Sequence, residues 1–164
     1  MRIVVLLTLL AGLALPAMAE PVRMPRGGVP AYAFDAPSGW EVHYDGDRLQ
    51  FIHPSNNLIV QLGMIDFEDA DAIPLVALAA ALAESSAFPA PTQKRTGAIA
   101  GRAGESFRST GTMSGIELEF VVTLVHVDKT HIASVIRTAR PDTTEAQYAA
   151  FDALDARIRI VTRP

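Results

Sequence analysis

The dipeptide Asp45-Gly46 places the strongest local limit on the fold of this chain. It supplies the positive φ angles of a two-residue β-hairpin turn, and alternating apolar and polar residues stand on both sides of it. Pairing across this turn gathers the apolar side chains on one face, in the pairs Tyr44 with Asp47, Val42 with Leu49 and Trp40 with Phe51. A shift by one residue would turn that face to solvent. We therefore expect antiparallel sheet.

Similar patterns continue along the chain and predict further strands, over residues 58–65, 97–99, 103–110, 116–127 and 131–138. Residues 73–83 carry no polar side chain and are rich in alanine and leucine, which favours a helix. A second helix is expected after Pro141, with an apolar stripe formed by Tyr148, Phe151, Leu154 and Ile158. This order predicts an α+β fold in which a central antiparallel sheet is flanked by helices.

The first nineteen residues have the three parts of a secretory signal peptide. Arg2 supplies a positive charge, residues 3–15 form an apolar core too short to cross a bilayer, and Ala17 and Ala19 suit signal peptidase. We expect cleavage of residues 1–19 and no membrane span afterwards. Residues 20–31 hold three prolines and two glycines and predict a flexible N-terminal arm, and residues 32–164 predict a single domain.

Composition narrows the class of protein further. Cleavage would leave 145 of the 164 residues, enough for one domain. Loss of Arg2 leaves 13 of the 14 basic side chains against 18 acidic ones, a formal charge of −5, so nucleic acid is not an expected partner. The absence of cysteine excludes thiol chemistry, cysteine-ligated zinc and lipoprotein acylation. We expect a bacterial protein released into the periplasm or the medium.

The residues from Tyr32 to Trp40 read Tyr-Ala-Phe-Asp-Ala-Pro-Ser-Gly-Trp. They are similar to the opening strand of the PsbP-like superfamily, which ends in Pro-x-Gly-Trp. The resemblance continues through residues 49–51, the alanine-rich middle helix, the glycine-marked strand at 101–107 and the closing helix with Phe151. The superfamily includes the extrinsic PsbP subunit of photosystem II, the Ran-binding Mog proteins and many bacterial exported proteins.

This resemblance implies an α/β/α sandwich built on an antiparallel sheet. It also implies action by binding and assembly, without catalysis. No functional residue of PsbP or of the Ran-binding members matches a motif of this chain, so their particular activities are not transferred.

Two pairs of side chains are candidates for chemistry. If Val127 pairs with Thr130 across an Asp128-Lys129 turn, His126 and His131 face each other and could share a divalent ion, although two ligands do not complete a site. Glu117 and Glu119 project from one strand face about 7 Å apart, a spacing that suits paired-carboxylate catalysis and equally suits solvated charges. A periplasmic hydrolase or a metal-binding protein is therefore the alternative function.

The helix at 73–83 is the favoured candidate for function because its outer face lacks charge. Val76, Ala77, Ala80 and Ala81 stand where a surface helix normally carries charged residues. Either the loop at 85–94 covers this face, or the face docks a protein partner or an apolar ligand in the cell envelope. We expect an exported, non-catalytic binding or assembly protein that needs no cofactor.

Overall fold

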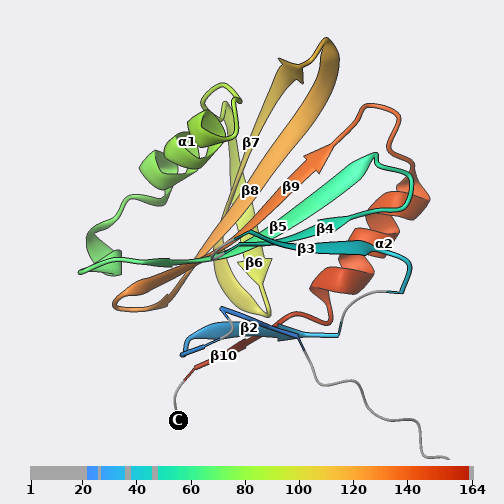
Figure 1. Cartoon of the computed structure of the whole chain (residues 1–164). Helices are drawn as coiled ribbons and strands as arrows, with labels where there is room; N and C mark the ends of the chain where they lie inside the picture. The colour runs from blue at the N-terminus through green and yellow to red at the C-terminus, as the bar shows by residue number, and fades with distance from the viewer. Residues whose placement is uncertain (1–21, 26, 36–37, 46–47, 163–164) are drawn as a thin grey trace, which may run out of the picture.

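The computed structural model describes residues 22–25, 27–35, 38–45 and 48–162 (Figure 1). They form a three-stranded sheet in the order β1-β2-β10 and a seven-stranded sheet in the order β3-β4-β5-β9-β8-β7-β6. The strands of the large sheet are β3 Glu41–Asp45, β4 Arg48–Ile52, β5 Leu58–Asp66, β6 Gln93–Ile99, β7 Arg102–Met113, β8 Ile116–Asp128 and β9 His131–Ala139. The two helices are α1 Leu75–Ser85, between β5 and β6, and α2 Glu145–Asp155, after β9. The small sheet consists of β1 Val22–Met24, β2 Ala31–Phe34 and β10 Arg159–Val161. Every strand pair is antiparallel, so the α+β prediction is confirmed.

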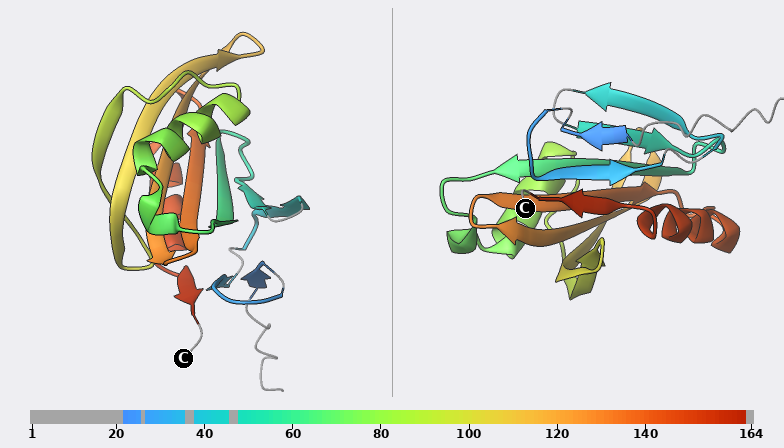
Figure 2. Two further views of the ribbon diagram at one scale, coloured as in Figure 1. Left: turned by 90° about the vertical axis from the view of Figure 1, so that its left-hand side faces the viewer. Right: turned by 90° about the horizontal axis from the view of Figure 1, so that it is seen from below.

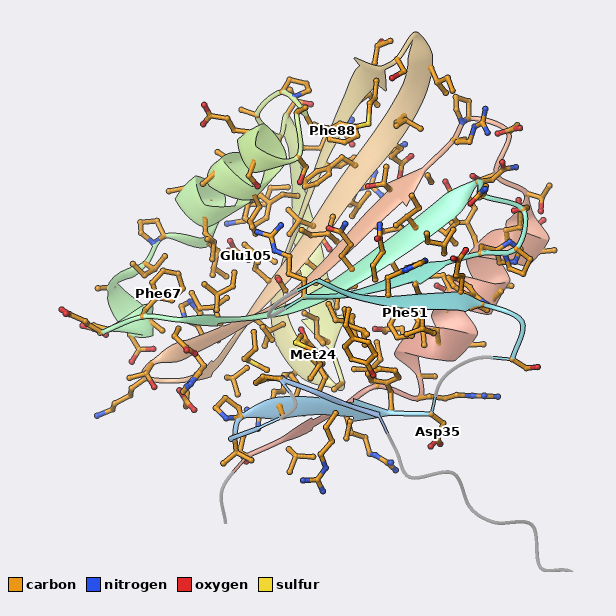
Figure 3. The ribbon with its side chains drawn as sticks, in the orientation of Figure 1. Met24, Asp35, Phe51, Phe67, Phe88 and Glu105 are labelled. Carbon is orange, nitrogen blue, oxygen red and sulfur yellow. The ribbon has the colours of Figure 1, made fainter. Side chains whose placement is uncertain are left out.

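The large sheet is buried on both faces, with a separate hydrophobic cluster on each. Helix α1 packs on one face, where its Ala79, Leu82 and Ala83 meet the inward side chains of β7, β8 and β9. The other face is covered by α2 and the small sheet, and Met24 and Phe51 lie in the cluster between them (Figure 3). Figure 2 shows α1 lying across the sheet on the side away from the small sheet.

The small sheet includes part of the segment 20–31, for which a flexible arm is predicted. Val22–Met24 forms β1 and pairs with β2, and Met24 is only 2% exposed. Tyr32 of β2 is fully buried, and its hydroxyl donates a hydrogen bond of 2.9 Å to the Ser134 carbonyl of β9. Met24 and Tyr32 thus cover apolar side chains of the large sheet that water would otherwise contact. The predicted signal peptide, residues 1–19, lies outside the described residues.

The hairpin is present with a different register from the predicted one. Tyr44 pairs with Leu49 and Val42 with Phe51, so the connection comprises residues 46 and 47, which lie outside the described residues. A shift of two residues leaves every side chain on its original face, so the apolar pattern cannot distinguish the two registers. The apolar face is as predicted, since Leu49 and Phe51 are fully buried and Val42 packs against them.

Both helices occur close to their predicted positions. Helix α1 starts at Leu75, two residues later than predicted, because a 3₁₀ turn at Ala70–Ala72 precedes it and Pro74 occupies the N-cap position. Helix α2 is capped by Thr144, whose hydroxyl accepts from the Gln147 amide in a capping box. Of the predicted stripe of α2, Leu154 and Ile158 are buried, and Tyr148 and Phe151 are half-buried against the same core.

Candidate functional site

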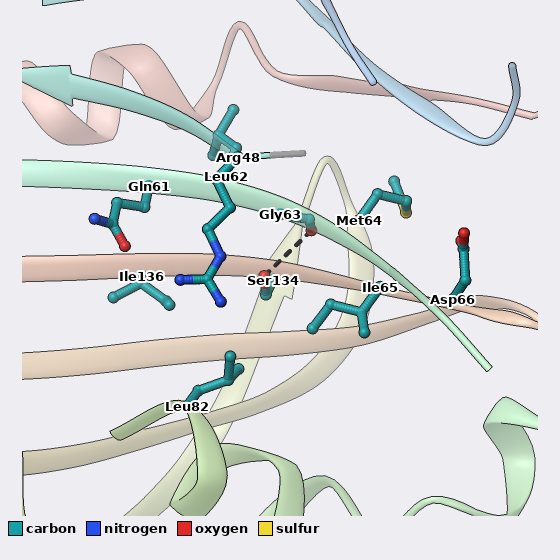
Figure 4. Close-up of a pocket in the computed structure, with 10 residues that line it drawn as sticks. All are labelled: Arg48, Gln61, Leu62, Gly63, Met64, Ile65, Asp66, Leu82, Ser134 and Ile136. Carbon is teal, nitrogen blue, oxygen red and sulfur yellow. Dashed lines mark hydrogen bonds between the residues drawn. The ribbon is translucent and has the colours of Figure 1, made fainter. Parts of the chain in front are cut away.

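A groove of about 350 Å³ lies beside α1 on the face of the large sheet that this helix covers in part. Helix α1 sits over β7 and β8, so the part of the same face formed by β4, β5 and β9 is less covered. Figure 4 shows the groove between Leu82 of α1 and these strands. Side chains that reach the groove therefore come from segments far apart in the chain.

Arg48, Gly63 and Ser134 lie side by side across three strands of the groove floor. A Cβ atom at position 63 would stand 2.7 Å from the Ser134 Oγ, so glycine makes room for this hydroxyl, which donates to the Gly63 carbonyl at 3.2 Å. The missing side chain also leaves space for Arg48, whose guanidinium extends from β4 across β5 toward Ser134 and Ile136 (Figure 4). Within the described residues, no carboxylate pairs with Arg48.

The opposite wall of the groove is apolar. Leu82 and Ile136 are 8% and 4% exposed, and Ile65 is half-buried beside them. Gln61 adds one amide, and Asp66 lies at one end. His131 holds the Asp66 carboxylate with its Nε2 at 3.1 Å. The groove thus joins one guanidinium and a few hydrogen-bonding groups to an apolar wall.

A second hollow of about 270 Å³ continues along the same face toward the tip of the β7–β8 hairpin. Its apolar lining comes from Ile59, Met113, Ile116 and Leu118. Met113 and Ile116 are 43% and 40% exposed, among the few large apolar side chains that the described residues leave in contact with water. Exposed apolar groups gathered beside a hollow are typical of a binding surface.

The two hollows are in line along β5. Ile59 lines the second hollow, and Gln61, Gly63 and Ile65 line the first. Alternate residues of β5 therefore line both hollows. Alternate residues share a face, and the seven residues from Ile59 to Ile65 span about 20 Å. We call this combined surface the β5 groove. Arg48 lies beside Gly63 within it, and Asp66 lies at the end beyond Ile65. The exposed apolar side chains of Met113 and Ile116 lie at the other end, which Arg140 also lines.

The residues predicted on the outer face of the middle helix lie beside this groove on α1. Val76, Ala77 and Ala81 are exposed, Val76 by 55%, and Ala80 is half-buried. The loop after α1 therefore leaves most of this face uncovered, and its Phe88 packs instead on Phe120 with ring centroids 5.0 Å apart. The prediction that a partner binds these four residues stays a prediction.

The predicted pairing of His126 with His131 is wrong. Residue 126 pairs with Ile132, and His131 pairs with Asp128, because a bulge between His126 and Asp128 shifts the register. The His131 Nδ1 lies 2.7 Å from the Asp128 carboxylate, so the two rings are not directed at one ion. In the described part of the chain, no three potential metal-ligating side chains gather closely enough to hold a metal ion.

The hydrogen bonds at Asp128 have a consequence for its titration. Partial burial raises its pKa, but the Thr130 amide, the His131 ring and the Thr130 hydroxyl together hold the pKa below its ordinary value. The ionised Asp128 carboxylate therefore stabilises the turn between β8 and β9.

Glu117 and Glu119 do share a strand face, as predicted, but their surroundings differ. Glu119 is held by Arg108 at 2.5 Å, and Glu117 is exposed. The guanidinium of Arg108 therefore neutralises one of the two carboxylates. Among the described residues, neither helix is both long and apolar enough to pass through a bilayer.

The sequence alone did not single out the residues that build the β5 groove. Nothing in the sequence around Arg48 indicates a site, and Ser134 lies 71 residues from the Gly63 carbonyl that it contacts. One local signal was available: an isolated glycine inside the apolar strand 58–66 indicates a close approach of other groups. Neither hollow can be found without the pairing of β5 with β9.

Comparison with known proteins finds solved structures of similar fold, including the following two. LpqN, a protein involved in cell envelope biogenesis of Mycobacterium tuberculosis, is 13% identical with a TM-score of 0.57, and the match covers 87% of this chain and 90% of LpqN. A protein from Bacteroides thetaiotaomicron VPI-5482 is 10% identical with a TM-score of 0.54, and the match covers 81% of this chain but about half, 45%, of the other. No family model and no curated protein matches the chain. The chain therefore shares the fold of LpqN, and the resemblance to the PsbP-like superfamily stays a prediction.

Proposed function

We propose that this protein is an exported, non-catalytic protein of the cell envelope that binds an amphiphile in the β5 groove. The ligand class is a single acyl or alkyl chain with an anionic head. The observation that carries the proposal is the polarity of the groove, which runs from Arg48, whose guanidinium pairs with no carboxylate of the described residues, to the exposed apolar side chains of Met113 and Ile116.

Each end of the groove suits one part of such a ligand. A guanidinium binds carboxylate or phosphate through paired N–H donors, and the Ser134 hydroxyl and the Gln61 amide stand beside it as further hydrogen-bonding groups. The apolar wall of Leu82 and Ile136 leads toward the hairpin tip, where an alkyl chain would cover Met113 and Ile116. Burial of an apolar chain contributes about 0.8 kcal/mol per methylene group.

The location in the cell envelope is supported by two observations. Residues 1–19 have the pattern of a secretory signal peptide. The fold is also similar to that of LpqN, whose role is in cell envelope biogenesis. An exported protein meets lipids and their breakdown products in that compartment, where a groove of this polarity finds its ligand.

Binding is tested with cis-parinaric acid, a fatty acid whose fluorescence rises in an apolar site. We expect saturable binding by the wild type and about tenfold weaker binding by Arg48→Glu, because Arg48 is exposed and solvent screening limits its attraction for an anion to about 1 kcal/mol, which charge reversal turns into a weak repulsion. Ile116→Glu is expected to weaken binding about fivefold through lost apolar contact. Both residues are exposed, so the variants should fold.

Arg159→Glu is the matched control. Arg159 is exposed on β10 of the small sheet, on the other side of the molecule from the groove. Arg159→Glu changes the net charge by the same amount as Arg48→Glu. An equal loss of cis-parinaric acid affinity in the two variants would show an effect of overall charge and would contradict the proposal. Dodecylamine, which has a cationic head, should compete with cis-parinaric acid more weakly than laurate does.

A protein partner on α1 is a second candidate, favoured by the exposed Val76, Ala77 and Ala81. Ala77→Asp with Ala81→Asp would place two charges on this face and should abolish such docking without unfolding the helix. Chemical cross-linking of the wild type and the double variant in intact cells compares the two. A cross-linked partner that is lost in the variant supports docking, and an unchanged pattern removes this candidate.

A further inference from the structure

A third hollow, of about 190 Å³, lies on the face of the large sheet opposite the β5 groove. Three arginines from three strands line it: Arg95 of β6, Arg108 of β7 and Arg137 of β9. Glu119 is the one carboxylate among its lining residues. This hollow is independent of the proposed amphiphile site, because alternate residues of the strands point to opposite faces.

The strand register brings the three guanidinium groups together. Arg108, Val121 and Arg137 lie in one cross-strand row, so only a valine separates the two arginines. Arg95 pairs with Ser106 in the next row, which makes it a diagonal neighbour of Arg108. Diagonal Cα atoms lie about 7–8 Å apart, well within the reach of two long side chains. All three guanidinium groups can therefore contact one small ligand.

Arg137 is held in place before any ligand arrives. Its guanidinium carbon lies 4.8 Å from the ring centroid of Phe151 and 5.3 Å from that of Tyr148, both on α2. The Arg137 Nε is buried and has no hydrogen-bond acceptor among the described residues. A buried donor without an acceptor is costly, and an anion in the hollow would remove part of that cost.

The charges of the lining define the ligand. Glu119 accepts from Arg108 at 2.5 Å and neutralises one of the three positive charges. Arg95 and Arg137 have no ion pair with a carboxylate within the described ranges. The lining residues together carry a formal charge of +2 in a protein whose net charge is −4, and Asp155 interacts electrostatically with Arg137 from outside the lining. A phosphoryl group carries between −1.5 and −2 at pH 7 and offers three acceptor oxygens to guanidinium donors.

The geometry points to a binding site for a phosphoryl group, formed by Arg95, Arg108 and Arg137. The volume of about 190 Å³ is below the roughly 300–1,000 Å³ of drug-sized ligand sites, so the site takes the phosphoryl group and little else. Free phosphate and the phosphate of a lipid headgroup present the same chemistry. Guanidinium donors bind either source through the same oxygens.

Isothermal titration calorimetry with sodium phosphate at constant ionic strength tests the site. We expect saturable binding that is about tenfold weaker in Arg95→Gln and in Arg137→Gln, and within about twofold of the wild type in the control Arg159→Gln, because each lost charge-assisted contact costs at least a factor of ten. Arg95 is exposed and forms no cation–π contact in the described structure, so Arg95→Gln tests the site even if Arg137→Gln unfolds. Binding should be tighter at pH 7.5 than at pH 5.5, since phosphate gains its second negative charge between these pH values.

Vesicles containing phosphatidic acid distinguish the two sources. Capture of vesicles by the wild type and its loss in Arg95→Gln would assign the site to a lipid headgroup, and binding of free phosphate alone would assign it to a soluble phosphate. Both results support the site. Absence of saturable phosphate binding by the wild type, or equal weakening in Arg95→Gln and Arg159→Gln, would overturn it.

Discussion

Gly104 lies where β7 passes close to β8, and its replacement by alanine gives a sharp test of the sheet packing. A Cβ atom at position 104 would stand 2.1 Å from the Leu124 carbonyl oxygen and 2.7 Å from the Val125 Cγ2. An ordinary carbon–oxygen contact is about 3.3 Å, so the strands would have to separate locally by roughly 1.2 Å. The obstacle is backbone, which cannot rotate away as the end of a flexible side chain would.

The magnitude follows from two costs and one gain. Overpacking costs about 1–3 kcal/mol. Strand separation weakens one or two ladder hydrogen bonds, each about 1 kcal/mol. Alanine gains back about 0.5–1 kcal/mol relative to glycine through the unfolded chain. We therefore expect Gly104→Ala to lower the free energy of unfolding by about 2–4 kcal/mol, a large part of the 5–15 kcal/mol typical of a domain.

Urea unfolding followed by circular dichroism measures this difference. Gly27→Ala is the control, because nothing lies within 4 Å of a Cβ atom at that position, and its free energy of unfolding should stay within about 0.5 kcal/mol of the wild type. Thermal unfolding should show a fall of about 10 °C for Gly104→Ala. Equal stability of the two variants would refute the reasoning about close strand approach.

Three further predictions concern stability and processing. Tyr32→Phe removes the buried donor to the Ser134 carbonyl and should cost about 1 kcal/mol in urea unfolding; no loss would show that this bond adds nothing to the fold. Asp128→Asn should lower the free energy of unfolding at pH 7 by up to about 1 kcal/mol, because only the ionised carboxylate gains from Thr130 and His131. This difference should disappear as the pH falls through the lowered pKa of Asp128, and a difference that persists at pH 2 would contradict this origin. Mass spectrometry of the protein expressed with residues 1–19 in a bacterial host should show a mature chain that begins at Glu20, and an uncleaved chain would contradict the signal peptide.

The sequence predicts the large sheet well because its signal is local. Alternation along residues 116–127 predicts the buried face of β8, where Phe120, Val122 and Leu124 are fully buried. The same alternation does not distinguish registers that differ by two residues. For this reason, the predicted register of the hairpin between β3 and β4 differs by two residues from the observed one.

The small sheet could not be predicted from local pattern. Strand β1 has three residues followed by proline, and β10 has three residues after α2, so neither shows a periodic pattern of useful length. Both pair with β2, and Met24 and Ile158 become buried only when that sheet packs on the large one. The information lies in contacts between segments more than 100 residues apart, as in the bond from Tyr32 to Ser134.

The candidate sites also differ in whether a local sequence pattern indicates them. The uncharged face of α1 is visible in the sequence as Val76, Ala77, Ala80 and Ala81. The β5 groove and the arginine hollow are not, because each combines single side chains from several strands. The predicted pairing of His126 with His131 is wrong because one β-bulge changes which residues lie opposite each other on β8 and β9.

Photo-cross-linking with a fatty acid that carries a diazirine near the end of its chain tests the central claim most directly. The proposal predicts that the label attaches to peptides containing Ile59, Met113 or Ile116, and that excess laurate or the Arg48→Glu substitution prevents this labelling. Labelling confined to α2 or to the small sheet, or labelling that laurate does not reduce, would contradict a ligand site in the β5 groove.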